Sequence, residues 1–147
     1  MVCEILLLSP KTKPYTIMPV VNILLSNGCN TTKLRLFVKE TIAAEPILAV
    51  KKDWVQVNII GHSPEGRLFF PSLDAMYVDI ILWKKPERIT PEAIKKFNVV
   101  CEKIARWMRK NITPYAGCGK QTILVKMTFV DPEETPLFLL EREPKSA

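Results

Sequence analysis

The stretch Gly117–Thr122 reads GCGKQT and is the part of this chain closest in residue type to a phosphate-binding loop. Such a loop has the pattern Gly-x-x-x-x-Gly-Lys-Ser/Thr, and the helix that follows points its N-terminus at the phosphates. Here Gln121 stands where Ser or Thr is needed, and Pro114 occupies the place of the first glycine. A strand-like segment follows, so we interpret GCGKQT as a connector between a helix and a strand.

Histidine and cysteine offer little for metal or nucleophile chemistry. The chain has one histidine, His62 in the turn GHSPEG, and four widely spaced cysteines: Cys3, Cys29, Cys101 and Cys118. A zinc site needs several such ligands at short, regular spacing, so we predict neither a metal nor another cofactor. The cysteines are expected to be free thiols in a reducing compartment. A Ser/His or Cys/His pair that uses His62 stays geometrically open, although no nucleophile motif surrounds it.

Carboxylates give no clear catalytic grouping. The candidate aspartates are scattered along the chain: Asp53, Asp74, Asp79 and Asp131. Asp79 lies inside an apolar strand, and we expect it to face outward, either together with Tyr77 and Ile81 or at a subunit contact. We therefore predict that the protein is not an enzyme. The alternative is an unrecognised site in which His62, Asp74 or Asp79 meet in a pocket.

Basic residues gather in and around one predicted helix. The chain has 21 Lys and Arg against 15 Asp and Glu, a formal charge of +6. Such a cluster attracts the phosphates of RNA or DNA through counterion release, and it also attracts an anionic membrane. The predicted contacts are Lys84, Lys85, Arg88, Lys96, Lys103, Arg106, Lys110 and Lys120, with Trp83 and Trp107 as aromatic anchors. The alternative is a merely solvated helix face.

The helix that carries this cluster is predicted from Thr90 to about Lys110. Thr90 suits the N-cap, and Pro91 fits the first helical position because its φ is already fixed. Two i, i+4 pairs, Glu92–Lys96 and Glu102–Arg106, have the favourable orientation. The apolar face expected to pack on the core consists of Ile94, Phe97, Cys101, Ile104 and Met108.

Most other segments predict strands. Residues 1–9, 15–25, 54–61, 67–70, 75–83, 121–130 and 137–141 are β-prone runs. Residues 33–39 alternate apolar and polar side chains, which predicts a half-buried strand, although their C-terminal part could form a short helix before Pro46. We expect one α+β domain over residues 1–147, with a polar tail at 141–147. Its fold is a twisted, mainly antiparallel sheet packed against one long amphipathic helix at about 90–110.

One family resemblance covers residues 76–130. This segment runs through a strand, a turn with Pro86 and Arg88, an amphipathic helix with Trp107 near its end, a glycine loop with Lys120, and a strand. The order resembles the central part of the matrix proteins of rhabdoviruses and, less closely, of bornaviruses. The chain departs from those proteins in two respects: it has no Pro-Pro-x-Tyr or Pro-Thr/Ser-Ala-Pro motif, and its N-terminal arm has only Lys11 and Lys13.

The resemblance implies a non-enzymatic viral structural protein. A protein of that kind associates with itself, adheres to the anionic inner leaflet of a membrane, and condenses the viral nucleocapsid or its RNA. It is located in the virion and the host cytoplasm. The chain is accordingly expected to have no secretion signal and no transmembrane segment. The alternative is a small basic accessory protein that binds nucleic acid through non-specific backbone contacts.

Overall fold

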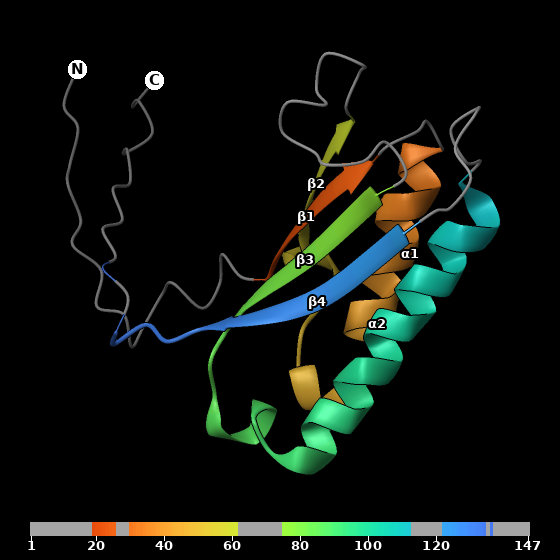
Figure 1. Cartoon of the computed structure of the whole chain (residues 1–147). Coiled ribbons are helices and arrows are strands. Elements are labelled where there is room, and N and C mark those ends of the chain that lie inside the picture. The colour runs from red at the N-terminus through yellow and green to blue at the C-terminus, as the bar shows by residue number, and fades with distance from the viewer. Residues whose placement is uncertain (1–18, 26–29, 62–74, 113–121, 135, 137–147) are drawn as a thin grey trace, which may run out of the picture.

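The computed structural model describes residues 19–25, 30–61, 75–112, 122–134 and 136. Four strands and two α-helices alternate along these residues (Figure 1). They are β1 (Val20–Leu25), α1 (Thr31–Ala43), β2 (Gln56–Gly61), β3 (Ala75–Trp83), α2 (Pro91–Asn111) and β4 (Thr122–Val130). Three short 3₁₀ helices lie in the connections: η2 (Pro46–Leu48), η3 (Lys52–Trp54) and η5 (Pro86–Arg88).

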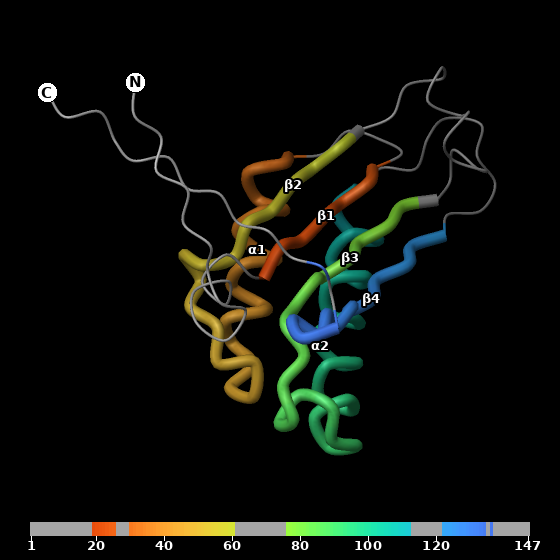
Figure 2. The backbone as a smooth tube through the Cα atoms, turned by 90° about the vertical axis from the view of Figure 1, so that its left-hand side faces the viewer, coloured from red at the N-terminus to blue at the C-terminus, as the bar shows by residue number. Residues whose placement is uncertain are grey.

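The four strands form one mixed sheet in the order β2-β1-β3-β4, as Figure 2 shows. β1 pairs with β2 in parallel, β3 pairs with β4 in parallel, and the central pair β1–β3 is antiparallel. The fold class is α+β, as predicted, but the expected mainly antiparallel sheet is wrong. Each parallel pair is joined by a helix, so the chain consists of two β–α–β units, β1–α1–β2 and β3–α2–β4.

Helix α1 corrects the predicted strand at residues 33–39. Its buried side chains are Leu34, Val38 and Ile42, which are spaced by four residues and therefore lie on one helical face. Leu36, which the strand interpretation placed beside Leu34, is 44% exposed. Asn30 caps the helix, because its Oδ1 accepts a hydrogen bond of 3.1 Å from the Lys33 N–H.

Helix α2 confirms the predicted long helix and its N-cap. The Thr90 hydroxyl accepts a hydrogen bond of 3.2 Å from the Ala93 N–H, and Pro91 is the first helical residue. The predicted apolar face was partly wrong, since Ile94 is 39% exposed and Cys101 is only half-buried. The buried side chains of α2 are Ala93, Phe97, Val100, Ile104 and Met108.

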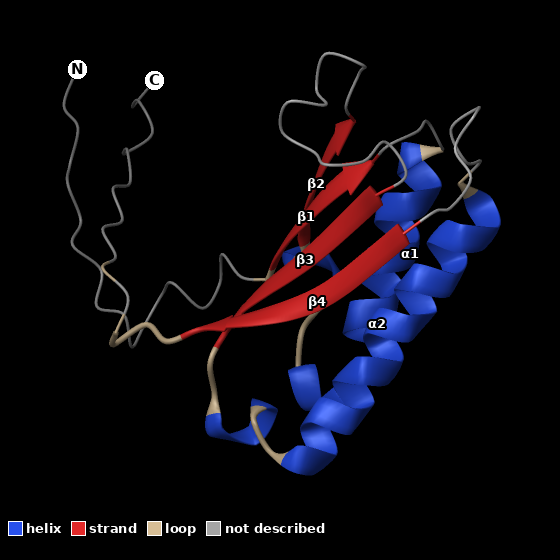
Figure 3. Cartoon of the chain, viewed as in Figure 1, coloured by secondary structure: helices blue, strands red, loops and turns tan. Residues whose placement is uncertain are grey.

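Both helices pack on the same face of the sheet (Figure 3). Their buried side chains meet those of β1 and β3, and the partly buried Ile123, Val125, Met127 and Phe129 of β4 complete the core, on one side of β4 as predicted. Phe97 of α2 contacts Phe129, with ring centroids 5.9 Å apart. The helices therefore have one flank fixed in the core and one flank exposed.

Three predicted strands, at residues 1–9, 67–70 and 137–141, lie outside the described residues. Within the described part of the chain, neither helix combines the length and the apolar character needed to cross a bilayer.

Candidate functional site

The exposed flank of α2 carries a row of basic side chains. We call this set the basic face: Lys95, Lys96, Lys103, Arg106, Arg109 and Lys110, all of which are exposed. Glu92 and Glu102 are the two acidic residues on the same helix. A helix of 21 residues is about 30 Å long, so these charges extend along most of one side of the molecule. The predicted contacts Lys96, Lys103, Arg106 and Lys110 all belong to the basic face.

One residue of the basic face is paired with a carboxylate. Arg106 donates from Nε and Nη2 to Oε1 of Glu102, at 2.9 and 2.7 Å, which confirms the predicted i, i+4 pair. The second predicted pair is wrong, because no ion pair joins Glu92 to Lys96, both of which the structure describes. Among the described residues, Lys96, Lys103 and Lys110 make no ion pair either. Within the described chain, most of the positive charge on α2 thus has no ion-pair partner.

Arg88 and Trp83 are not part of this surface. Arg88 is only 4% exposed, and its guanidinium donates to the carbonyl oxygens of Trp83 and Leu48, at 2.8 and 2.7 Å. Burial lowers the pKa of Arg88, while the nearby Glu87 carboxylate acts in the opposite direction. Trp83 is 2% exposed at the end of β3. The predictions that Arg88 contacts phosphate and that Trp83 is a surface anchor are therefore wrong.

Trp107 is half-buried between the two helices. Its ring stacks on Phe37 of α1, with centroids 5.3 Å apart and an interplanar angle of 18°. One face of the indole is therefore already used in packing. The expected aromatic anchor is a contact between α1 and α2.

Two other predicted contacts, Lys84 and Lys85, lie in the chain before α2. Lys84 is exposed and directly follows β3, where its N–H donates to the Val130 carbonyl at 2.8 Å. Lys85 is half-buried and precedes η5. Lys120, together with the connector Gly117–Gln121, lies outside the described residues.

The catalytic alternative receives no support from the residues that the structure describes. Asp79 faces away from the helices, as predicted, and its Oδ1 accepts a hydrogen bond of 2.8 Å from the Thr128 hydroxyl. His62 and Asp74 are outside the described residues. Within the described part, no group of three or more metal-ligating side chains is found. Burial raises the pKa of the Cys101 thiol, so this thiol stays protonated at neutral pH.

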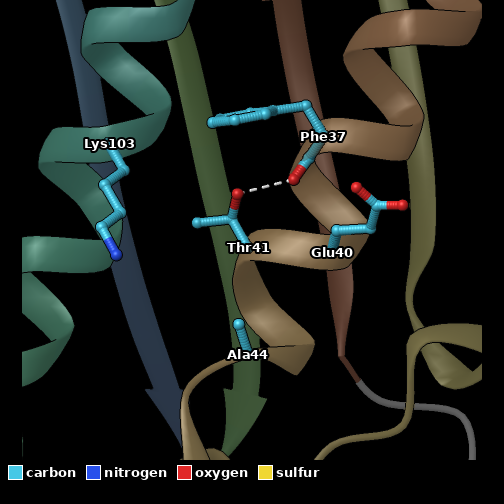
Figure 4. Close-up of a pocket in the computed structure, with 5 residues that line it drawn as sticks. All are labelled: Phe37, Glu40, Thr41, Ala44 and Lys103. Atoms are coloured by element: carbon cyan, nitrogen blue, oxygen red, sulfur yellow. Dashed lines mark hydrogen bonds between the residues drawn. The ribbon is translucent and has the colours of Figure 1, made fainter.

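A groove between the two helices was not predicted from the sequence. It has a volume of about 270 Å³ and is lined by Phe37, Glu40, Thr41 and Ala44 of the α1 region and by Lys103 of α2 (Figure 4). The groove was missed because residues 33–39 were interpreted as a strand. Recognising the spacing of Leu34, Val38 and Ile42 by four would have placed a second helix beside α2.

Comparison with known proteins does not assign a family. No protein-family profile matches the chain, and no curated protein matches its sequence. Among solved structures, the chain is similar to one described as "W0 fused 4-OT wild type symmetric trimer", with 13% identity and a TM-score of 0.48. The alignment covers 81% of this chain and 93% of that chain. A similarity of this extent carries no inference about activity or assembly.

Proposed function

We propose that the protein is a non-enzymatic structural protein that binds the phosphate backbone of nucleic acid through the basic face of α2. The observation that supports this proposal is the uncompensated charge on the exposed flank of one rigid helix. Three of its lysines, Lys96, Lys103 and Lys110, are seven residues apart and make no ion pair within the described chain. They therefore recur along one side of α2 at intervals of about 10 Å.

Nucleic acid is favoured over a membrane by how α2 is packed. The apolar flank of the helix is buried against the sheet, so it is not available for insertion into lipid. Trp107 stacks on Phe37, so it is not a free interfacial anchor. The exposed flank of α2 is therefore a charged surface. Its binding free energy is most favourable with a polymer of high charge density, because binding releases the polymer's condensed counterions.

Phosphate binding of this kind is expected to be independent of the nucleotide sequence. Lysine and arginine contacts to phosphate fix position and supply affinity, but they do not distinguish bases. The matrix-like role that the resemblance implies, condensation of a viral nucleocapsid, is one form of this proposal. Binding to an anionic membrane, the other contact that the resemblance implies, is the competing hypothesis, and the experiment below distinguishes it from nucleic-acid binding.

The test measures affinity for a single-stranded RNA of mixed sequence and for vesicles with and without an anionic lipid. With about four phosphates neutralised, log K should fall with log[salt] with a slope of about −3. The triple variant Lys96→Gln, Lys103→Gln, Lys110→Gln should bind RNA roughly tenfold or more weakly in low salt. Tight binding to anionic vesicles with no affinity for RNA would overturn the proposal in favour of a membrane surface.

Self-association is the second part of the proposed structural role. In the described sheet, β2 and β4 are the edge strands, and edge strands present unpaired N–H and C=O groups to other chains. Size-exclusion chromatography with light scattering at low and high salt should show species larger than one chain. A strict monomer in every condition would contradict this part and leave the RNA test unaffected.

A further inference from the structure

The groove between α1 and α2 has two chemically different walls. On the α1 side lie Phe37, Thr41 and Ala44, and on the α2 side lies Lys103. The Thr41 hydroxyl donates to the Phe37 carbonyl at 2.7 Å, so this hydroxyl is occupied. In Figure 4 the Thr41 methyl carbon lies on the side of Lys103, below the Phe37 ring. The α1 wall is therefore mainly apolar.

The apolar wall is held in place by its surroundings. The Phe37 ring stacks on Trp107, which lies one helical turn beyond Lys103 on α2. This stack joins the two helices beside the groove and restricts the rotamer of Phe37. A ligand that enters the groove would not have to order this side chain, which lowers the entropic cost of binding.

The charges around the groove leave one cation uncompensated. Glu40 lies on the rim, but its carboxylate is 3.5 Å from the ammonium of Lys52 and is paired with it. Lys103 makes no ion pair with any described residue. Among the described residues, the groove therefore combines an apolar wall with one cation, Lys103, that has no carboxylate partner.

We propose that this groove binds a small monocarboxylate with an apolar body, such as an aryl-substituted propionate. The carboxylate pairs with the Lys103 ammonium, and the apolar body contacts Phe37, the Thr41 methyl group and Ala44. The volume of about 270 Å³ lies just below the usual range of ligand pockets, which begins at about 300 Å³, so the groove suits only a small molecule of this kind. The proposal shares Lys103 with the basic face, but its probes and shift mapping need no nucleic acid, so it can succeed or fail separately from the RNA test.

The probe is 3-phenylpropionate, followed by ¹H–¹⁵N chemical-shift mapping on the full chain. A dissociation constant on the order of 1 mM is expected, because an open groove removes only part of the ligand from water. Shifts should centre on the amides around Phe37, Ala44 and Lys103. The neutral 3-phenylpropanamide should bind about fivefold more weakly, which is the effect of one exposed ion pair. The amine 3-phenylpropylamine should bind more weakly still.

Two variants test separately how the charge and the shape of the groove contribute to binding. Lys103→Met should weaken 3-phenylpropionate binding about fivefold and abolish the preference over the amide. Ala44→Leu fills the groove without changing charge and should abolish binding. The matched control is Lys126→Met, which removes an exposed lysine from the opposite face of the sheet and should leave binding unchanged. Equal or tighter binding of the amine, or shifts centred elsewhere, would overturn the proposal.

Discussion

The two β–α–β units have the same connectivity but use their helices differently. In the first unit, α1 has 13 residues, and its Arg35 is already engaged, because the guanidinium donates to the Val57 carbonyl at 2.8 Å. Glu40 of α1 is paired with Lys52. In the second unit, α2 has 21 residues and carries six exposed cations on one flank, and among the described residues only Arg106 of these has a carboxylate partner. Lys33 and Lys39 of α1 also have no carboxylate partner within the described chain, so the two helices differ in how many cations they carry on one flank rather than in how completely those cations are paired.

The largest expected difference between the units concerns packing in the core. Phe97 of α2 is buried against Phe129, so Phe97→Ala should lower the free energy of unfolding by about 3–5 kcal/mol. Phe37 of α1 is only partly buried, and Phe37→Ala should cost about 1–2 kcal/mol. Chemical denaturation of both variants measures the two values. Equal losses would contradict the difference in burial between Phe97 and Phe37.

A smaller effect is expected at the contact that joins the two units. Arg88 precedes α2 and donates to the Leu48 carbonyl, which lies in the first unit after α1. Arg88→Met leaves the carbonyls of Trp83 and Leu48 without this donor, but it also removes a buried cation whose Nε has no partner. The net loss of stability should be about 2 kcal/mol. Arg88→Lys keeps one donor group and should lose less stability than Arg88→Met. Unchanged stability in Arg88→Met would show that the contact of Arg88 with the two carbonyls is dispensable.

The smallest stability effects are expected at the helix N-caps. Asn30→Ala and Thr90→Ala each remove one side-chain acceptor from a backbone N–H, so each should cost about 1 kcal/mol. Thr90→Ser keeps the hydroxyl and should be close to neutral. Chemical denaturation, followed by the circular dichroism of the helices, measures the loss of stability in each of the two alanine variants. A loss at Asn30 with none at Thr90 would mean that Pro91 alone fixes the start of α2.

The second unit could be predicted from the sequence because its signals are local. Thr90 followed by Pro91 marks the start of a helix, and the run Ala75–Trp83 is strongly β-prone. In the first unit, residues 33–39 alternate like a strand, while Leu34, Val38 and Ile42 recur like a helix. The same short segment thus shows both the two-residue period of a strand and the helical spacing of its buried residues. The packing of these residues in the core decides in favour of the helix. Missing α1 hid the parallel pair β1–β2, since a parallel pair needs a crossover connection. The parallel pair β3–β4 was missed although its crossover helix α2 was predicted.

The residues of the candidate site also fall into two groups: those whose positions follow from local sequence signals and those whose positions depend on tertiary contacts. The exposed positions of the basic face follow from helical geometry alone, so Lys96, Lys103, Arg106 and Lys110 were placed correctly on the outer flank. The burial of Arg88 depends on Leu48, which is 40 residues away in the sequence. The stack of Trp107 on Phe37 likewise depends on a helix that was not predicted. Contacts of this kind need the tertiary arrangement.

The most direct test compares matched charge removals in the two units. One variant replaces Lys96, Lys103 and Lys110 of α2 with glutamine, and the other replaces Lys33, Lys39 and Lys51 of the first unit, so both change the net charge equally. The account predicts that the first variant reduces the salt slope of RNA binding by about 2, whereas the second leaves it nearly unchanged. Equal reductions in both variants would show that net charge, rather than the basic face of α2, governs binding and would contradict the account.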